Sequence, residues 1–213
     1  SVANFQNGFS SISVPAVLAT LVSDELHFPN LSMVGVDDRA AAHTAVAHLI
    51  AQGHSKIAVL GGPATSFPSR MRRLGAQDAM EQAGLTFDDR LYGLSNYDFE
   101  SAYHAMNSLL ARRAEFTALF AMSDVIAFGA IRALVSAGFR VPQDVSVIGF
   151  DGITMSRYCV PVMTTIVQPS EQIALQSIEL LINQIEHGAP AQTITLQPEL
   201  QQGESVCPCR HPL

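Results

Sequence analysis

Three arginines stand close together in one short stretch of an otherwise acidic chain. Arg70, Arg72 and Arg73 lie in the segment PSRMRRLG, although the 213 residues hold only 12 Lys and Arg and carry a formal net charge of −7. The segment follows the apolar run KIAVLGG, and its pattern predicts the first turns of a helix. A helix dipole favours anions at that end. We therefore expect something to compensate for these three cations.

A binding site can be assembled from polar side chains that follow predicted strands. The guanidinium of Arg72 can contact a carboxylate, a phosphate or a vicinal pair of hydroxyls through two parallel hydrogen bonds. Asp151 can accept two hydrogen bonds from hydroxyls or from an exocyclic amine. The ring of Tyr97 offers a flat face on which a sugar or a base can stack. Three further residues can complete a polar rim: Ser123, Asp124 and Gln168.

Each of these residues also has a structural interpretation. Arginines in a first helical turn are usually solvated, Asp124 is a natural helix N-cap, and Asp151 can simply cap a turn. On the residues alone, both interpretations stay open.

Signatures of the common enzyme classes are absent from the sequence. It contains no G-x-S-x-G elbow, no phosphate-binding G-x-x-x-x-G-K-[ST] loop and no G-x-G-x-x-G after a strand. Cys207, Cys209 and His211 lie in one short tail without a second ligand cluster, which argues against a metal site. We therefore expect a protein that is not an enzyme and that needs no metal or other cofactor.

Composition and charge exclude several classes of partner. The acidic balance argues against this chain itself holding a nucleic-acid backbone, which requires a basic face. No apolar run is long enough to cross a bilayer. A signal peptide requires a basic start, but no Lys or Arg precedes Arg39. Three cysteines without disulfide spacing fit a reducing compartment. The sequence therefore predicts a cytoplasmic location without a membrane partner.

Strand and helix patterns alternate along the chain, which predicts the α/β class with parallel sheets flanked by helices. The predicted strands are 14–20, 32–36, 56–62, 91–95, 117–122, 145–150 and 163–167. The predicted helices are 37–52, the arginine helix ending at Gly84, 99–113, 124–138 and 170–187. The tail at 193–202 has the pattern of an extended pair. Ligands of such sheets bind at the carboxyl ends of the strands, where the polar residues named above lie.

Several segments resemble the effector-binding domain of LacI/GalR-type transcriptional regulators. The strongest is RVPQDVSVIGFD followed by TTIVQP, and VGVDDRAAAHTAVAHLIAQGHSKIAVLGGP adds to it. The resemblance spans about 34–205. It implies a two-lobed fold like that of periplasmic binding proteins, with 1–36 and 168–188 as the remaining part of the N-terminal lobe and 37–167 and 189–213 as the C-terminal lobe. The N-terminal lobe is expected to be incomplete, because its first strand–helix units have no counterpart here.

The resemblance also implies which residues contact the effector. Arg72 takes the place of the family's arginine three residues before a helix glycine, here Gly75, whereas Arg70 and Arg73 are expected to be solvated. The other implied contacts are Tyr97, Ser123, Asp124, Asp151 and Gln168. At position 123 the family more often has Asn, so the presence of Ser123 implies that a side-chain amide contact to the effector is lost or moved. At position 102 the family usually has Gly, and Ala102 is expected to change the packing only. Replacing Arg72 or Asp151 by alanine is expected to weaken binding and to leave the fold intact.

The function implied by the resemblance is that of an effector-sensing and dimerisation domain of a LacI-type regulator, a repressor. The implied effector is a small sugar-like ligand, with a nucleoside or purine as the second class. Operator DNA would be bound only through an N-terminal helix-turn-helix that this sequence does not contain, and the protein is expected to be a homodimer. A solute-binding protein of a sugar transporter is the alternative. Residues 1–12 have no clear counterpart in the family.

Overall fold

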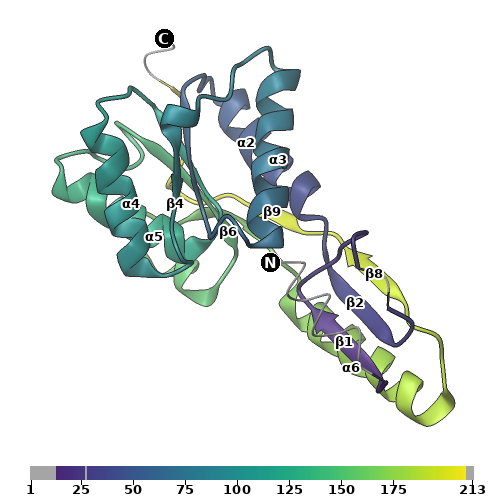
Figure 1. Cartoon of the computed structure of the whole chain (residues 1–213). Helices are drawn as coiled ribbons and strands as arrows, with labels where there is room; N and C mark the ends of the chain where they lie inside the picture. The colour runs from purple at the N-terminus through teal and green to yellow at the C-terminus, as the bar shows by residue number, and fades with distance from the viewer. Residues whose placement is uncertain (1–12, 27, 210–213) are drawn as a thin grey trace. The chain divides into compact units, whose positions relative to one another are not determined.

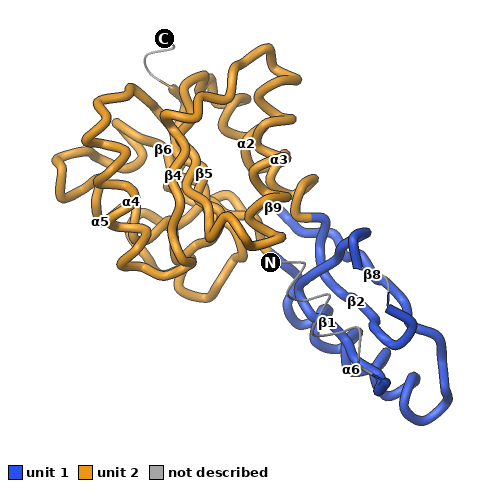
Figure 2. Tube along the Cα trace, viewed as in Figure 1, with its two compact units in different colours: residues 1–37, 168–199 blue, residues 38–167, 200–213 orange. Residues whose placement is uncertain are grey.

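The computed structural model describes residues 13–26 and 28–209, and these residues form two compact units (Figure 2). The larger unit takes Asp38–Val167 and the chain from Leu200 onward, and the smaller unit takes the chain up to Asp37 together with Gln168–Glu199. The chain therefore passes between the units more than once, so each unit is built from segments far apart in the sequence.

The larger unit is built on a six-stranded sheet. In sheet order its strands are β4 (Tyr92–Leu94), β3 (Ile57–Gly61), β5 (Ala118–Ala121), β6 (Ser146–Asp151), β7 (Thr164–Val167) and β9 (Glu199–Gln201). Neighbouring strands from β4 to β7 run parallel. Every residue of β3 and β5 is buried, as expected for parallel strands that are covered by helices on both faces.

Two pairs of helices cover this sheet, one pair on each face (Figure 1). Helices α2 (Asp38–Ala51) and α3 (Phe67–Gln82) pack against each other, and so do α4 (Phe99–Ala111) and α5 (Asp124–Ser136). Side chains cap three of the helices: Ser66, Asp98 and Ser123 each accept a hydrogen bond from a backbone N–H in the first turn. Two short 3-10 turns, Asp89–Leu91 and Thr154–Arg157, complete the unit.

In the described residues, the smaller unit is a three-stranded parallel sheet with one helix packed on it. The strand order is β1 (Ala16–Ala19), β2 (Leu31–Val36) and β8 (Thr193–Leu196). Helix α6 (Ser170–His187) buries Ile173 and Leu180 against Val34 of the central strand. The helix ends at Gly188, whose φ of 61° is the left-handed conformation that glycine adopts at helix C-termini.

The predicted α/β class with parallel sheets flanked by helices is confirmed, but two boundaries differ from the expectation. Asp37, which was expected in the larger lobe, lies in the smaller unit. The sequence assigned 189–213 to the larger lobe, whereas residues up to Glu199 lie in the smaller unit. The reason is the pairing of β8 with β2, from Met33 opposite Thr193 to Val36 opposite Leu196. The extended pair expected in the tail is thus two strands, β8 and β9, that join different sheets.

Among the described residues, no helix is both long and apolar enough to cross a membrane. The same residues contain no group of three or more His, Cys, Asp or Glu that could hold a metal ion. Of the tail residues weighed as metal ligands, His211 lies outside the described residues. Cys207 and Cys209 are unbridged.

Candidate functional site

A charged cluster lies at the carboxyl ends of the central strands in the larger unit, and Arg72 is its centre. Arg72 extends from α3 and is buried, with 5% of its surface exposed. Its Nε donates to Oδ1 of Asp38 over 2.7 Å, and its Nη1 donates to the carbonyl of Met122 and lies 3.6 Å from Oδ1 of Asp151. The guanidinium carbon lies 3.6 Å from the ring centroid of Phe150. Carboxylates, a carbonyl and an aromatic face therefore all contact one cation.

The protein's own carboxylates compensate for the charge of Arg72. Burial by itself lowers the pKa of an arginine, because it disfavours the charged form. The negative charges of Asp38 and Asp151 more than offset this effect and raise the pKa of Arg72. Arg72 is thus a permanent cation within an anionic surrounding.

The two neighbouring arginines differ from each other. Arg73 was expected to be solvated, but its Nη2 donates to Asp89 over 2.7 Å and its guanidinium lies 4.4 Å from the ring centroid of Tyr92. Arg70 is exposed, with its guanidinium 5.4 Å from the ring centroid of Phe67. Contacts with carboxylates and aromatic rings therefore replace the compensation that the helix dipole cannot supply.

Asp151 and Tyr97 both have a positive backbone φ, which is uncommon for residues other than glycine. Asp151 ends β6 with φ of 109°, and Tyr97 precedes α4 with φ of 59°. Only two other non-glycine residues in the described part of the chain have positive φ, namely Thr20 and Arg113. Such conformations cost free energy and cluster at ligand sites. The side chain of Asp151 is 28% exposed, so it can be reached from solvent.

The hydroxyl of Tyr97 is the second feature that points to a ligand. It is buried, and no described residue makes a hydrogen bond with it. The ring lies so close to Gly62 that a Cβ at position 62 would come within 2.0 Å of the ring carbon Cε2. Since buried polar atoms normally have a hydrogen-bond partner, a ligand hydroxyl or a water is the natural partner of this group.

Ser123 and Asp124 are both buried. The hydroxyl of Ser123 accepts from the backbone N–H of Ile126 and caps α5. Asp124 has no exposed surface; its Oδ1 accepts from the hydroxyl of Thr165 over 2.6 Å, and its Oδ2 accepts from the N–H of Ile153 over 2.9 Å. Ser123 therefore caps α5 and Asp124 holds the loop after β6, and a direct contact of either residue with an effector stays a prediction.

Burial raises the pKa of Asp124 from 3.8 to about 6, and the nearby charge of Asp151 adds to the increase. The folded state therefore holds this proton more tightly than the unfolded chain does. The stabilisation that results is present at low pH and is lost as the pH rises from about 4 through 6.

We expect the difference in unfolding free energy, wild type minus Asp124→Asn, to fall by up to about 3 kcal/mol between pH 4 and pH 7, because each pKa unit corresponds to about 1.4 kcal/mol. Urea denaturation of both proteins at pH 4, 5, 6 and 7 measures this difference, and titrations common to both proteins cancel in it. A difference that does not change with pH would show that the pKa of Asp124 is not raised in the folded state.

Gln168 belongs to the smaller unit, at the start of α6, where its carbonyl accepts from the N–H of Ser170. Its expected contact with an effector stays a prediction. The structure adds Asp38, which the sequence had assigned only to the start of a helix. The one signal for it in the sequence was an acidic residue directly after a strand end.

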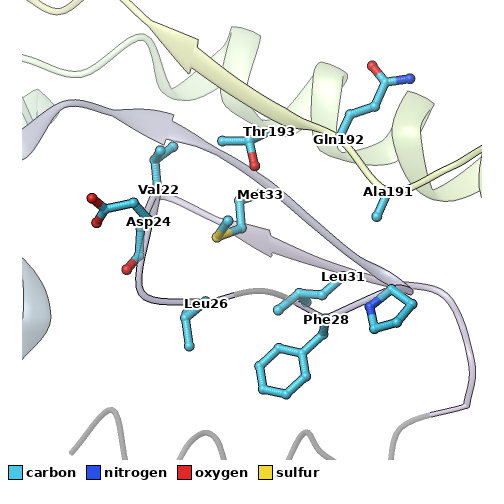
Figure 3. Close-up of a pocket in the computed structure, with 11 residues that line it drawn as sticks. Val22, Asp24, Leu26, Phe28, Leu31, Met33, Ala191, Gln192 and Thr193 are labelled. Carbon is cyan, nitrogen blue, oxygen red and sulfur yellow. The ribbon is translucent and has the colours of Figure 1, made fainter.

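A hollow with a volume of about 600 Å³ lies in the smaller unit (Figure 3). Leu26, Phe28, Leu31 and Met33 give it a mostly apolar lining, and Asp24 is the only ionisable residue among the described residues that line it. Its described lining residues do not include the convergent charged groups of the Arg72 cluster. The Arg72 cluster is therefore the better candidate for recognition of a polar ligand.

Comparison with protein families places residues 46–206 in the periplasmic binding protein-like domain family. The HTH-type transcriptional regulator MalR of Clostridium butyricum is 34% identical over 94% of this chain and 60% of its own length. The HTH-type transcriptional repressor PurR of Haemophilus influenzae is 38% identical over 75% of this chain and 48% of its own length. The chain thus spans about half to three fifths of the length of these two relatives.

A solved structure supports the same assignment. A sugar-binding transcriptional regulator of the LacI family from Escherichia coli, complexed with phosphate, superposes with a TM-score of 0.81 at 30% identity. The superposition covers 98% of this chain and 74% of the other. These similarities extend over both units of the chain. The protein belongs to the periplasmic binding protein-like family and is an effector-binding domain of the LacI type.

Proposed function

We propose that the protein is the effector-sensing part of a LacI-type transcriptional repressor and that it binds a small, sugar-like molecule at the Arg72 cluster. Ligand binding would change the relative stability of two conformations, and only one of them would allow operator DNA to be bound. The DNA contact would be made by a helix-turn-helix outside this sequence. We further infer that it acts in the cytoplasm as a homodimer. The regulator relatives favour this role over that of a transporter's solute-binding protein.

The observation that carries the proposal is the pairing of Asp151 with Arg72. A carboxylate that is 28% exposed lies at a strand end, 3.6 Å from a buried guanidinium. Carboxylate oxygens accept strong hydrogen bonds from hydroxyls, and the buried hydroxyl of Tyr97 lies in the same unit without a described partner. Both groups suit a polyhydroxyl ligand. The sugar-binding regulator from Escherichia coli supports the same ligand class.

The test is calorimetric titration of the full chain with glucose, galactose, ribose, maltose, cellobiose, adenosine and hypoxanthine. We expect one of these to bind and Asp151→Asn to weaken that binding by about 10- to 100-fold, because a hydrogen bond to a charged group contributes about 1.5–3 kcal/mol. Asparagine tolerates positive φ as aspartate does, so the thermal unfolding of this variant should change little.

Asp89→Asn is the matched control, because it removes one carboxylate of the same unit from a side chain that is 78% exposed and pairs with Arg73. It should bind as the wild type does. If no compound binds, or if Asp151→Asn binds as tightly as the wild type, the proposed site is wrong.

A further inference from the structure

The Arg72 cluster contains more carboxylates than guanidinium groups. Asp38 and Asp151 both lie within ion-pair distance of Arg72. A third carboxylate, Asp124, is near enough for the charge of Asp151 to influence it. All of these groups belong to the larger unit. The site therefore presents an excess of negative charge around one cation.

Two of the three guanidinium nitrogens of Arg72 already donate hydrogen bonds to the protein. Its Nε points to Asp38 and its Nη1 to the carbonyl of Met122. Asp38 itself is buried, with 4% of its surface exposed, so solvent screens this ion pair only weakly. A carboxylate or phosphate ligand that sought Arg72 would compete with Asp38 and would approach Asp151, a group of like charge.

From this geometry we propose that Asp38 is a specificity-determining residue: by neutralising Arg72, it makes the site accept uncharged polyhydroxyl effectors and reject those that carry a carboxylate or a phosphate. The inference rests on the proposed function and narrows it. From the sequence alone, a ligand carboxylate, a phosphate or a pair of hydroxyls could each contact Arg72. The ion pair with Asp38 favours the hydroxyls.

The remaining polar groups are consistent with this selectivity. Asp151 can accept hydrogen bonds from ligand hydroxyls, whereas a ligand carboxylate offers it no proton. The hydroxyl of Tyr97 is uncharged and can donate to a ligand hydroxyl or accept from one. Like charges placed opposite each other in a binding site are a general means of excluding the wrong ligand.

The experiment compares neutral sugars with their own charged derivatives. The full chain is titrated with three sets: glucose, gluconate and glucose 6-phosphate; galactose and galacturonate; ribose and ribose 5-phosphate. We expect a neutral member to bind at least tenfold more tightly than its charged partners. Asp38→Asn keeps the shape and an acceptor for Nε but removes the charge, so the ratio of neutral to charged affinity should fall at least tenfold.

Asp89→Asn removes the same charge from an exposed carboxylate that pairs with Arg73, and it should leave the ratio unchanged. If Asp38→Asn does not fold, the ratio of neutral to charged affinity is compared between the wild type and Asp151→Asn. Removal of the charge of Asp151 should also lower this ratio. A charged member that binds the wild type as tightly as its neutral partner would overturn the inference and leave the proposed function standing. If no member of any set binds, the selectivity is overturned for these sugars, and the proposed function fails only if none of the seven compounds named above binds either.

Discussion

Replacing Arg72 by methionine should lower the free energy of unfolding by about 3–5 kcal/mol, because it leaves the carboxylate of Asp38 buried without its cation. Asp38 and Arg72 are both almost fully buried, and their side chains meet over 2.7 Å. The sequence had suggested that loss of Arg72 would affect ligand binding alone. The ion pair changes that expectation, since it connects the start of α2 with α3.

A double-mutant cycle separates the ion pair from the packing of the two side chains. Arg72→Met with Asp38→Leu removes both charges and fills the space with apolar atoms, so it should recover much of the stability that either single variant loses. Urea denaturation of the four proteins gives the coupling free energy. Additive effects of the two substitutions would show that the pair contributes nothing to stability.

The second large effect is expected at Gly75, where α2 and α3 make their closest approach. A Cβ at this position would lie 2.0 Å from the carbonyl oxygen of Arg39 and 3.0 Å from the backbone nitrogen of His43. Backbone atoms cannot relieve a clash by changing rotamer as a flexible side chain can, so the two helices would have to move apart. We expect Gly75→Ala to lower the free energy of unfolding by about 1–3 kcal/mol.

The sign of this change is informative, because helix propensity alone predicts the opposite result. Alanine is favoured over glycine inside a helix by about 1 kcal/mol. Glu81→Ala, at an exposed position of the same helix, is the control and should change stability by less than about 0.5 kcal/mol. Thermal unfolding of the two variants and of the wild type measures both effects. A Gly75→Ala protein that is more stable than the wild type would contradict the close approach.

Much of the fold could be predicted from the sequence, because local patterns determine where helices and strands lie. The predicted helix at 37–52 is α2 (Asp38–Ala51), and the helix at 170–187 is α6 (Ser170–His187). Apolar periodicity and the glycines that end helices are properties of neighbouring residues, and they need no knowledge of distant contacts. The resemblance to LacI-type effector domains came from such local stretches and is confirmed by the family comparison.

The sequence could not predict which strands pair with each other or which charged side chains form ion pairs, because both depend on tertiary structure. β8 and β9 are adjacent in the sequence but join different sheets, because strand pairing is decided by residues such as Met33 that lie far away along the chain. The same holds for the site. Arg72 and Asp151 could be selected as polar residues near strand ends, but their roles as effector contacts stay predictions.

By itself, the sequence determined the α/β class and the family, and it predicted which side chains recognise a polar ligand. The tertiary structure alone decided that Asp38, 34 positions before Arg72, pairs with that arginine, and that Asp124 is fully buried. Burial and distance set the strength of a charge interaction, and neither is a property of a residue and its sequence neighbours. Long-range packing therefore determines how these side chains can act.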